Sequence, residues 1–176
     1  DQDQFALTSQ QRTATAQAQG FFTHEIIPVS IAQRKGDPIV VDTDEHPRAS
    51  TTLEGLTKLQ PVVTAEGTVT AGNASGINDG AAALLIASDK AVAEYGLKAR
   101  AKIIGATVVG VEPRIKSLGK ENAIKKLLNQ TGLTLDQMDV IELNEAFSAQ
   151  ALAVTRDLGL ADDEARVNPN GGAIAL

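Results

Sequence analysis

The run Val140-Ile-Glu-Leu-Asn-Glu-Ala-Phe147 joins a short apolar strand to polar side chains at the point where a helix is expected to begin. Apolar residues then recur from Phe147 to Leu158 at helical spacing, which predicts a helix with one inward face. The free N–H groups and the dipole make the start of such a helix electropositive. Asn144 is therefore expected to donate a hydrogen bond, directly or through water, to an oxygen that becomes negative during acyl transfer.

A second interpretation of Asn144 stays open on these residues. Asn is among the preferred residues at a helix N-cap, where its side chain satisfies a free backbone N–H group. A purely capping Asn144 would have no part in chemistry.

The second informative stretch is Thr68-Val-Thr-Ala-Gly-Asn-Ala-Ser-Gly-Ile-Asn-Asp-Gly-Ala-Ala-Ala83. Its glycines and small polar residues indicate a loop whose backbone closely approaches a partner, and a tight structural turn is the alternative. The stretch leads into Leu84–Ala87, which we expect to be a buried strand. The glycine spacing matches neither a dinucleotide fingerprint nor a phosphate loop, and the interrupting polar residues argue against a membrane helix.

Three stretches resemble the thiolase family of acyl-CoA acyltransferases, namely the two above and the terminal Val167-Asn-Pro-Asn-Gly-Gly-Ala-Ile-Ala-Leu176. Within that family, they are most similar to the bacterial degradative enzymes. The opening residues 1–12 and the loop Asp44-Glu-His-Pro-Arg48 are similar to that family as well. The resemblance therefore runs almost from end to end.

The resemblance implies roles for individual residues. Asn144 matches the asparagine that holds a water in an oxyanion hole, and Glu145 is the partner of that network. Coenzyme A, as a substrate, is expected to contact Arg48 near its nucleotide end. Its pantetheine arm is expected to meet the loop residues Ala74, Ser75 and Gly76 and the wall residues Ala146 and Phe147. A solvated loop arginine is the alternative for Arg48.

The family's nucleophile is a cysteine, assisted by a histidine in a Gly-His-Pro motif and by a second cysteine. This chain has no cysteine and ends before such a motif appears, so we expect it to be an internal fragment that is inactive alone. His24 and His46 are expected to be loop residues without a catalytic role. Two separated histidines and no cysteine leave no plausible zinc site, and we expect no metal or prosthetic group.

Composition favours a soluble domain. The 176 residues are 43% apolar and only 3% aromatic, so a core must rest on Ala, Val, Ile and Leu. A net charge of −6 argues against nucleic-acid binding. No leader or membrane span is evident, which favours a cytoplasmic location, with an organellar one left open because the native N-terminus is expected to be missing.

The order of elements predicts an α/β fold, and the resemblance implies part of a layered α-β-α-β-α thiolase fold. Residues 1–64 are expected to hold a helix over 4–22, burying Leu7, Ala14, Ala18 and Phe21, and β-like runs of a coenzyme-covering loop domain. Residues 65–98 would end the N-terminal half, with a helix over 88–96. Residues 99–176 would begin the C-terminal half, with a strand over 100–110 and a helix over 121–130.

One stretch departs from the family pattern. The chain has Pro113-Arg-Ile-Lys-Ser-Leu-Gly-Lys120 where thiolases usually read Pro-Arg-x-Met-Gly-x-Gly-Pro, so that Lys116, Ser117 and Lys120 replace Met, Gly and Pro. Lys116 is a poor wall for an apolar acyl chain and could attract an acidic one. An exposed or altered loop is the alternative.

The resemblance as a whole implies thiolytic cleavage of a 3-oxoacyl-CoA, or the reverse condensation, through an acyl-cysteine in the complete protein. A homodimer or homotetramer is the family expectation. The competing hypothesis is a non-catalytic module that binds acyl-CoA or a partner subunit.

Overall fold

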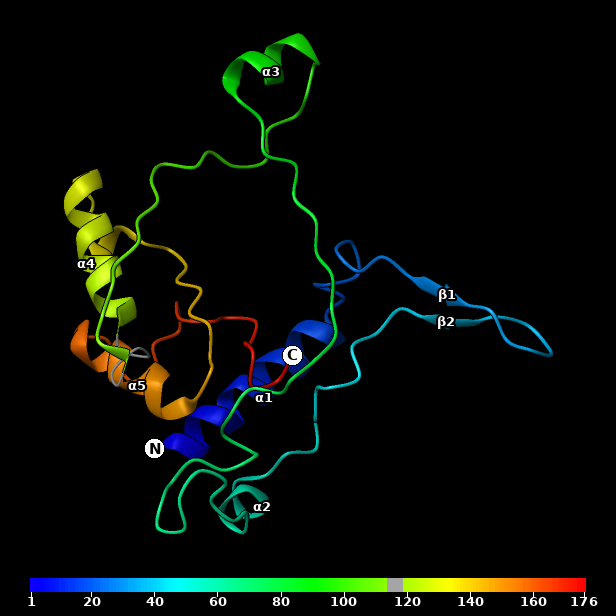
Figure 1. The fold of residues 1–176 in the computed structure, drawn as a ribbon, viewed down its shortest axis with the longest axis vertical. Coiled ribbons are helices and arrows are strands. Elements are labelled where there is room, and N and C mark those ends of the chain that lie inside the picture. The colour runs from blue at the N-terminus through cyan, green and yellow to red at the C-terminus, as the bar shows by residue number, and fades with distance from the viewer. Residues whose placement is uncertain (114–118) are drawn as a thin grey trace. The chain divides into compact units, whose positions relative to one another are not determined.

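The computed structural model describes residues 1–113 and 119–176, which form two compact units. The first unit comprises residues 1–76 and 138–176, and the second comprises residues 77–137. Figure 1 labels the α-helices and β-strands of both units. The first unit contains α1 (Gln2–Ala18), β1 (Val29–Ile31), β2 (Ile39–Val41), α2 (Leu53–Thr57) and α5 (Ser148–Asp157). The second contains α3 (Asp89–Glu94), α4 (Gly119–Thr131) and the 3-10 helix η2 (Leu135–Gln137).

Helix α1 forms as predicted and ends shortly before Gly20, whose φ of 69° suits glycine. The predicted inward face is wrong, because Ala18 and Phe21 are exposed and Leu7 and Ala14 are only half-buried. The buried face consists of small or hydrogen-bonding side chains, namely Ala6, Ser9, Gln10, Thr13 and Ala16. Short side chains let other backbone segments approach the helix, so close packing and hydrogen bonds override a weak apolar pattern here.

The C-terminal segment, residues 170–176, lies directly on this buried face of α1. A Cβ built on Gly171 would lie 1.9 Å from the Thr13 Oγ1 atom and 2.7 Å from the Ser9 carbonyl oxygen. A Cβ on Gly172 would lie 2.5 Å from the Glu145 carboxyl carbon. The two glycines therefore give the segment room to reach α1 and Glu145.

Helix α1 also contacts α2 and α5 within the first unit (Figure 1). Ala6, Leu56 and Ile174 form a small buried apolar cluster that joins α1, α2 and the C-terminal segment. The Arg156 guanidinium of α5 pairs with Asp1 at the start of α1 and with Asp162, each at 2.6 Å. This network is exposed, so its contribution to stability is modest.

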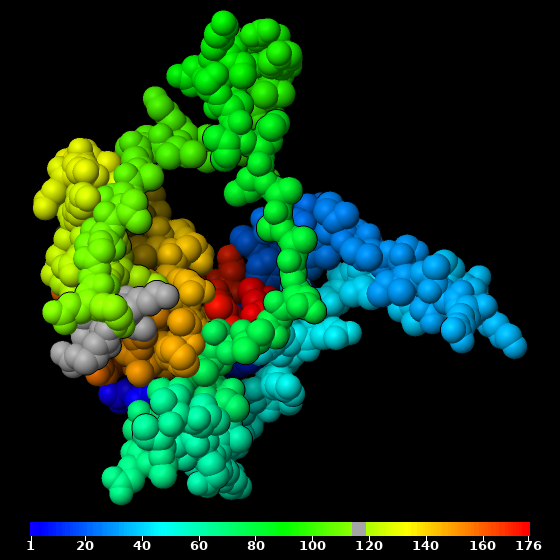
Figure 2. Space-filling view, in the orientation of Figure 1, coloured from blue at the N-terminus to red at the C-terminus, as the bar shows by residue number. Residues whose placement is uncertain are grey.

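Strands β1 and β2 pair as an antiparallel hairpin in which Val29 lies opposite Val41, and this confirms the two predicted β-like runs. The turn between them contains Gly36, whose φ of 86° favours glycine. All residues of both strands are exposed, and Figure 2 shows the hairpin as a narrow arm.

The strands predicted at Leu84–Ala87 and residues 100–110 do not form, and those predictions are wrong for this structure. Leu84 is 89% exposed rather than buried. A strand needs a neighbour joined to it by backbone hydrogen bonds, and no described residue forms a β-bridge with either segment. The helices predicted at 88–96 and 121–130 are confirmed as α3 and α4.

The atypical stretch before α4 is only partly described. Lys116 and Ser117 lie outside the described residues, so the hypothesis on the acyl wall stays a prediction. Gly119 and Lys120 begin α4 rather than belonging to a loop. None of the helices in the described ranges has the length and apolar character needed to cross a bilayer.

Replacing Gly171 by Ala should lower the free energy of unfolding by about 3 kcal/mol, because the new methyl group meets Thr13 and the φ of 85° disfavours any side chain. Urea denaturation measures the change. Gly159→Ala is the matched control, since Gly159 has a φ of 75° and nothing within 4 Å of its Cβ position. That variant should lower the free energy of unfolding by only about 1 kcal/mol, which is the cost of placing a side chain on a backbone with positive φ. Equal losses in the two variants would contradict close packing at Gly171.

Candidate functional site

Two segments that the sequence singled out lie side by side in the first unit. Ala74 and Phe147 form an antiparallel bridge. The Ser75 N–H donates to the Ala146 carbonyl at 3.0 Å, and the Ser148 N–H donates to the Asn73 carbonyl at 2.9 Å. The structure thus joins the loop of the glycine-containing stretch 68–83, called the glycine-rich loop below, to the start of α5 through backbone hydrogen bonds.

The buried Asn73 side chain fixes the shape of this loop. Its Oδ1 atom accepts from the Thr70 N–H at 2.9 Å, and its Nδ2 group donates to the Thr68 carbonyl and to Asp3. Residues 70–73 therefore form a tight structural turn, and the close approach of the loop to a partner stays a prediction. Ala74, Ser75 and Gly76 follow it and keep partly exposed side chains or backbone.

His46 links this loop to the segment that carries Arg48. A Cβ built on Gly76 would lie 2.5 Å from the His46 Cε1 atom, so the imidazole ring packs on the glycine backbone. His46 lies in a loop, as predicted, and its ring supports the Gly76 backbone. The Arg48 N–H donates to the Gln10 side chain at 2.8 Å, which ties the segment to α1. The Arg48 side chain is exposed, and its guanidinium makes no ion pair within the described ranges.

Asn144 does not cap a helix. Helix α5 begins at Ser148, and its N-cap is Phe147, so the capping interpretation of Asn144 is wrong. The segment from Asn144 to Phe147 instead precedes the helix, because Glu145 and Ala146 are held by other partners. Asn144 is exposed, Ala146 is half-buried, and Phe147 is 38% exposed.

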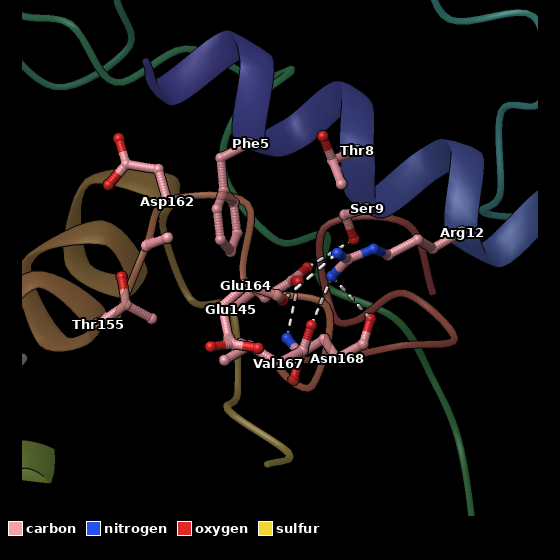
Figure 3. Close-up of a pocket in the computed structure, with 11 residues that line it drawn as sticks. Phe5, Thr8, Ser9, Arg12, Glu145, Thr155, Asp162, Glu164, Val167 and Asn168 are labelled. Atoms are coloured by element: carbon pink, nitrogen blue, oxygen red, sulfur yellow. Dashed lines mark hydrogen bonds between the residues drawn. The ribbon is translucent and has the colours of Figure 1, made fainter. Parts of the chain in front are cut away.

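Glu145 lies in a different environment from its neighbour. Its side chain is 1% exposed, and its Oε2 atom accepts from the Ser9 hydroxyl at 2.7 Å and from the Ile174 N–H at 3.2 Å. Its Oε1 atom accepts from the Asn168 amide at 2.8 Å. Figure 3 shows Ser9, Glu145 and Asn168 together below α1. The carboxylate therefore faces the interior of the unit while Asn144 faces outward.

Sequence reasoning missed Ser9 and Asn168 as members of this network. Both residues stood within stretches that carried the family resemblance, but Ser9 lies opposite the apolar residues to which the inward face of the helix was assigned. Their burial is visible only in the folded chain. A serine on the polar side of a predicted helix gives no sequence signal for such a contact.

The pocket in Figure 3 is too small for a substrate. Its volume of about 10 Å³ is about that of one water, and Phe5, Arg12 and Glu145 are among its lining residues. The Arg12 guanidinium donates to the Asn168 and Glu164 carbonyls, each at 3.4 Å, and to the Val167 carbonyl. In the described residues, no group of three or more His, Asp or Glu side chains gathers where a metal ion could bind.

Two family models match the chain, the N-terminal domain of thiolase over residues 1–90 and the C-terminal domain of thiolase over residues 97–176. The beta-ketoadipyl-CoA thiolase of Acinetobacter baylyi is 78% identical over all 176 residues. The 3-oxoadipyl-CoA/3-oxo-5,6-dehydrosuberyl-CoA thiolase of Escherichia coli is 56% identical over the same length. The chain covers 44% of each of these relatives, so it spans less than half their length.

Solved structures show the same fold. The Bacillus anthracis acetyl-CoA acetyltransferase matches with a TM-score of 0.94 and 42% identity, over 99% of this chain and 44% of that one. The human mitochondrial 3-ketoacyl-CoA thiolase in complex with CoA matches with a TM-score of 0.91 and 46% identity, over 99% of this chain and 42% of that one. The predicted resemblance and the predicted partial thiolase fold are confirmed. The division at 64 and 98 stays a prediction.

Glu145→Gln should lower the free energy of unfolding by about 2–3 kcal/mol. The amide group of Gln would turn a donor toward one of the three groups that now donate to the carboxylate, and bonds to a charged acceptor are the stronger ones. Chemical denaturation at neutral pH measures the loss.

Glu142→Gln is the matched control in the same segment. Partial burial and the nearby Glu145 carboxylate raise the pKa of Glu142, so its ionised form is disfavoured in the folded state. The native state then binds more protons than the unfolded chain, and stability falls as pH rises through the pKa of this group. The Glu142→Gln variant should therefore have a slightly higher free energy of unfolding than the unmodified chain at neutral pH. This difference should disappear below about pH 4. Equal destabilisation by both changes would contradict a specific role of the Glu145 bonds.

Proposed function

The chain belongs to the thiolase family, and from this premise we propose that it supplies the coenzyme A contacts and an oxyanion-stabilising group of a 3-oxoacyl-CoA thiolase. The reaction is cleavage of the 3-oxoacyl-CoA by CoA to acetyl-CoA and a shortened acyl-CoA, or the reverse condensation. Coenzyme A is a substrate, and no metal or prosthetic group takes part. The single observation that carries the proposal is the pairing of the glycine-rich loop with residues 146–148.

This pairing brings five of the proposed binding residues together on two adjacent, partly exposed backbone segments. The loop contributes Ala74, Ser75 and Gly76, and the start of α5 contributes Ala146 and Phe147. Small side chains along the loop leave room for a flexible arm, and the Ser75 hydroxyl offers a hydrogen bond. The Phe147 ring offers an apolar wall.

Asn144 is the group on this chain that would act on the reacting carbonyl oxygen. Its neighbours on both sides are anchored, and an amide on a fixed backbone is a preorganised donor, which is what an oxyanion hole requires. Glu145 would support Asn144 from the interior through its three hydrogen bonds. The acyl-cysteine of the reaction requires a residue outside these 176, which contain no cysteine.

Arg48 would bind the nucleotide end of the coenzyme. Its backbone is fixed to Gln10, while its side chain extends into solvent, so the guanidinium is available for phosphate or for stacking on adenine. His46 on Gly76 connects this segment to the pantetheine loop.

A 3-oxo diacid thioester, 3-oxoadipyl-CoA, is the substrate that we propose. The relatives of 78% and 56% identity are named for the beta-ketoadipyl and the 3-oxoadipyl thioester, respectively. We further propose a cytoplasmic homodimer or homotetramer that binds neither nucleic acid nor membranes.

Titration of the 176-residue chain with CoA tests the binding part. Arg48→Ala should weaken binding about tenfold or more, because one desolvated contact of a guanidinium with phosphate or adenine is lost. Arg100→Ala, at an exposed position in the second unit, removes the same charge elsewhere and should change the affinity less than twofold. Equal affinities of the two variants would remove Arg48 from the site.

An assay of the native gene product tests the reaction. With 3-oxoadipyl-CoA and CoA it should release acetyl-CoA and succinyl-CoA, and Asn144→Ala should lower kcat about 10²-fold with little change in KM for CoA. Acetoacetyl-CoA serves as the comparison substrate and should be cleaved more slowly. Binding of CoA without thiolysis of either substrate would favour the non-catalytic module instead.

A further inference from the structure

Asn168 completes a short parallel ladder with its side chain. The Ile141 N–H donates to the Arg166 carbonyl at 2.8 Å, and the Asn168 N–H donates to the Ile141 carbonyl at 2.9 Å. The next partners are side-chain atoms, because the Leu143 N–H donates to the Asn168 Oδ1 atom at 2.7 Å. The Asn168 Nδ2 group donates back to the Leu143 carbonyl at 2.8 Å. The amide group thus replaces a backbone peptide in the ladder.

The same amide reaches the residue on the other side of Asn144. Its Nδ2 group also donates to the Glu145 Oε1 atom at 2.8 Å. Leu143, Glu145 and Asn168 are all buried, with exposed fractions of 7%, 1% and 2%. Buried bonds of this kind are not exchanged for water, so the residues before and after Asn144 are held at fixed points.

The backbone of Asn168 adopts the conformation that this contact requires. Its φ is 47°, and it is the one non-glycine residue with positive φ among those described. Asn tolerates this region better than most residues, but it still costs free energy relative to an extended backbone. Such a conformation persists where surrounding bonds determine it, as the three side-chain bonds do here.

We infer that Asn168 is a positioning residue for Asn144. It clamps Leu143 and Glu145, and the exposed Asn144 side chain between them is thereby presented from a fixed backbone. The inference rests on the proposed function, since it assigns to Asn168 the orientation of the group proposed to meet the reacting oxygen. Asn168 itself touches no substrate in this scheme.

Kinetics of the native gene product test this clamp, by which we mean the hydrogen bonds of the Asn168 side chain to Leu143 and Glu145. Asn168→Gly removes the amide and suits the positive φ, while Asn168→Asp keeps the acceptor for Leu143 and loses the donor bonds. Each should lower kcat at least tenfold and change KM for CoA less than twofold. In a double-mutant cycle, adding Asn168→Gly to Asn144→Ala should lower kcat less than threefold further, because the group being positioned is already gone.

Leu152→Ala is the control for a general loss of stability, since Leu152 is buried in α5 outside this network. Assayed below its unfolding temperature, it should change kcat less than threefold. Effects of Asn168→Gly and Asn144→Ala that multiply in the double variant would overturn the inference. Should Asn168→Gly fail to fold, the same double-mutant cycle with Asn168→Asp tests whether Asn168 acts through Asn144.

A second readout separates the clamp from the proposed reaction. In the 176-residue chain labelled with ¹⁵N-asparagine, the Asn144 backbone and side-chain amide signals should shift in Asn168→Gly and stay in place in Leu152→Ala. Absence of thiolysis in the unmodified native gene product would refute the proposed function, and these signals would still test the clamp. Unchanged Asn144 signals in Asn168→Gly would refute the clamp whatever the activity.

Discussion

The buried Glu145 carboxylate is the constraint on which the arrangement of the first unit depends. No arginine or lysine forms an ion pair with it in the described ranges, so neutral donors must replace the water that it loses. These donors come from three places in the chain, the Ser9 hydroxyl on α1, the Asn168 amide and the Ile174 N–H group. One charge therefore requires α1, the segment before α5 and the C-terminal segment to meet.

The packing around this charge explains several residue types that the chain uses there. Gly172 leaves space for the carboxyl group, and Gly171 leaves space for Thr13. Ser9 serves twice, since its hydroxyl donates to Glu145 and accepts from the Gly172 N–H at 3.1 Å. A bulkier side chain at any of these points would separate a buried charge from its donors, which costs more than the lost contact alone.

The anchoring of Glu145 also fixes what lies on either side of it. Asn144 is exposed, and Ala146 and Ser148 bind the glycine-rich loop through backbone hydrogen bonds on either side of Phe147. The interior network and the proposed binding surface are thus two faces of one short segment. Stability and the proposed chemistry depend on the same backbone, which explains why a buried residue such as Asn168 can act on an exposed one.

The sequence by itself determined the family and the helices α1, α3, α4 and α5, because these depend on local periodicity and on short motifs. It did not determine the inward face of α1, where small polar side chains are buried instead of Leu7 and Ala14. It also predicted strands at Leu84–Ala87 and 100–110, because apolar runs are typical of buried strands. These strands do not form, since neither segment has a neighbouring strand with which to pair among the described residues. Only the tertiary structure decided that Phe147 rather than Asn144 caps α5, and that Asn168 completes a ladder with its side chain. Both depend on contacts between residues far apart in the chain, and such contacts leave no periodic trace in the sequence.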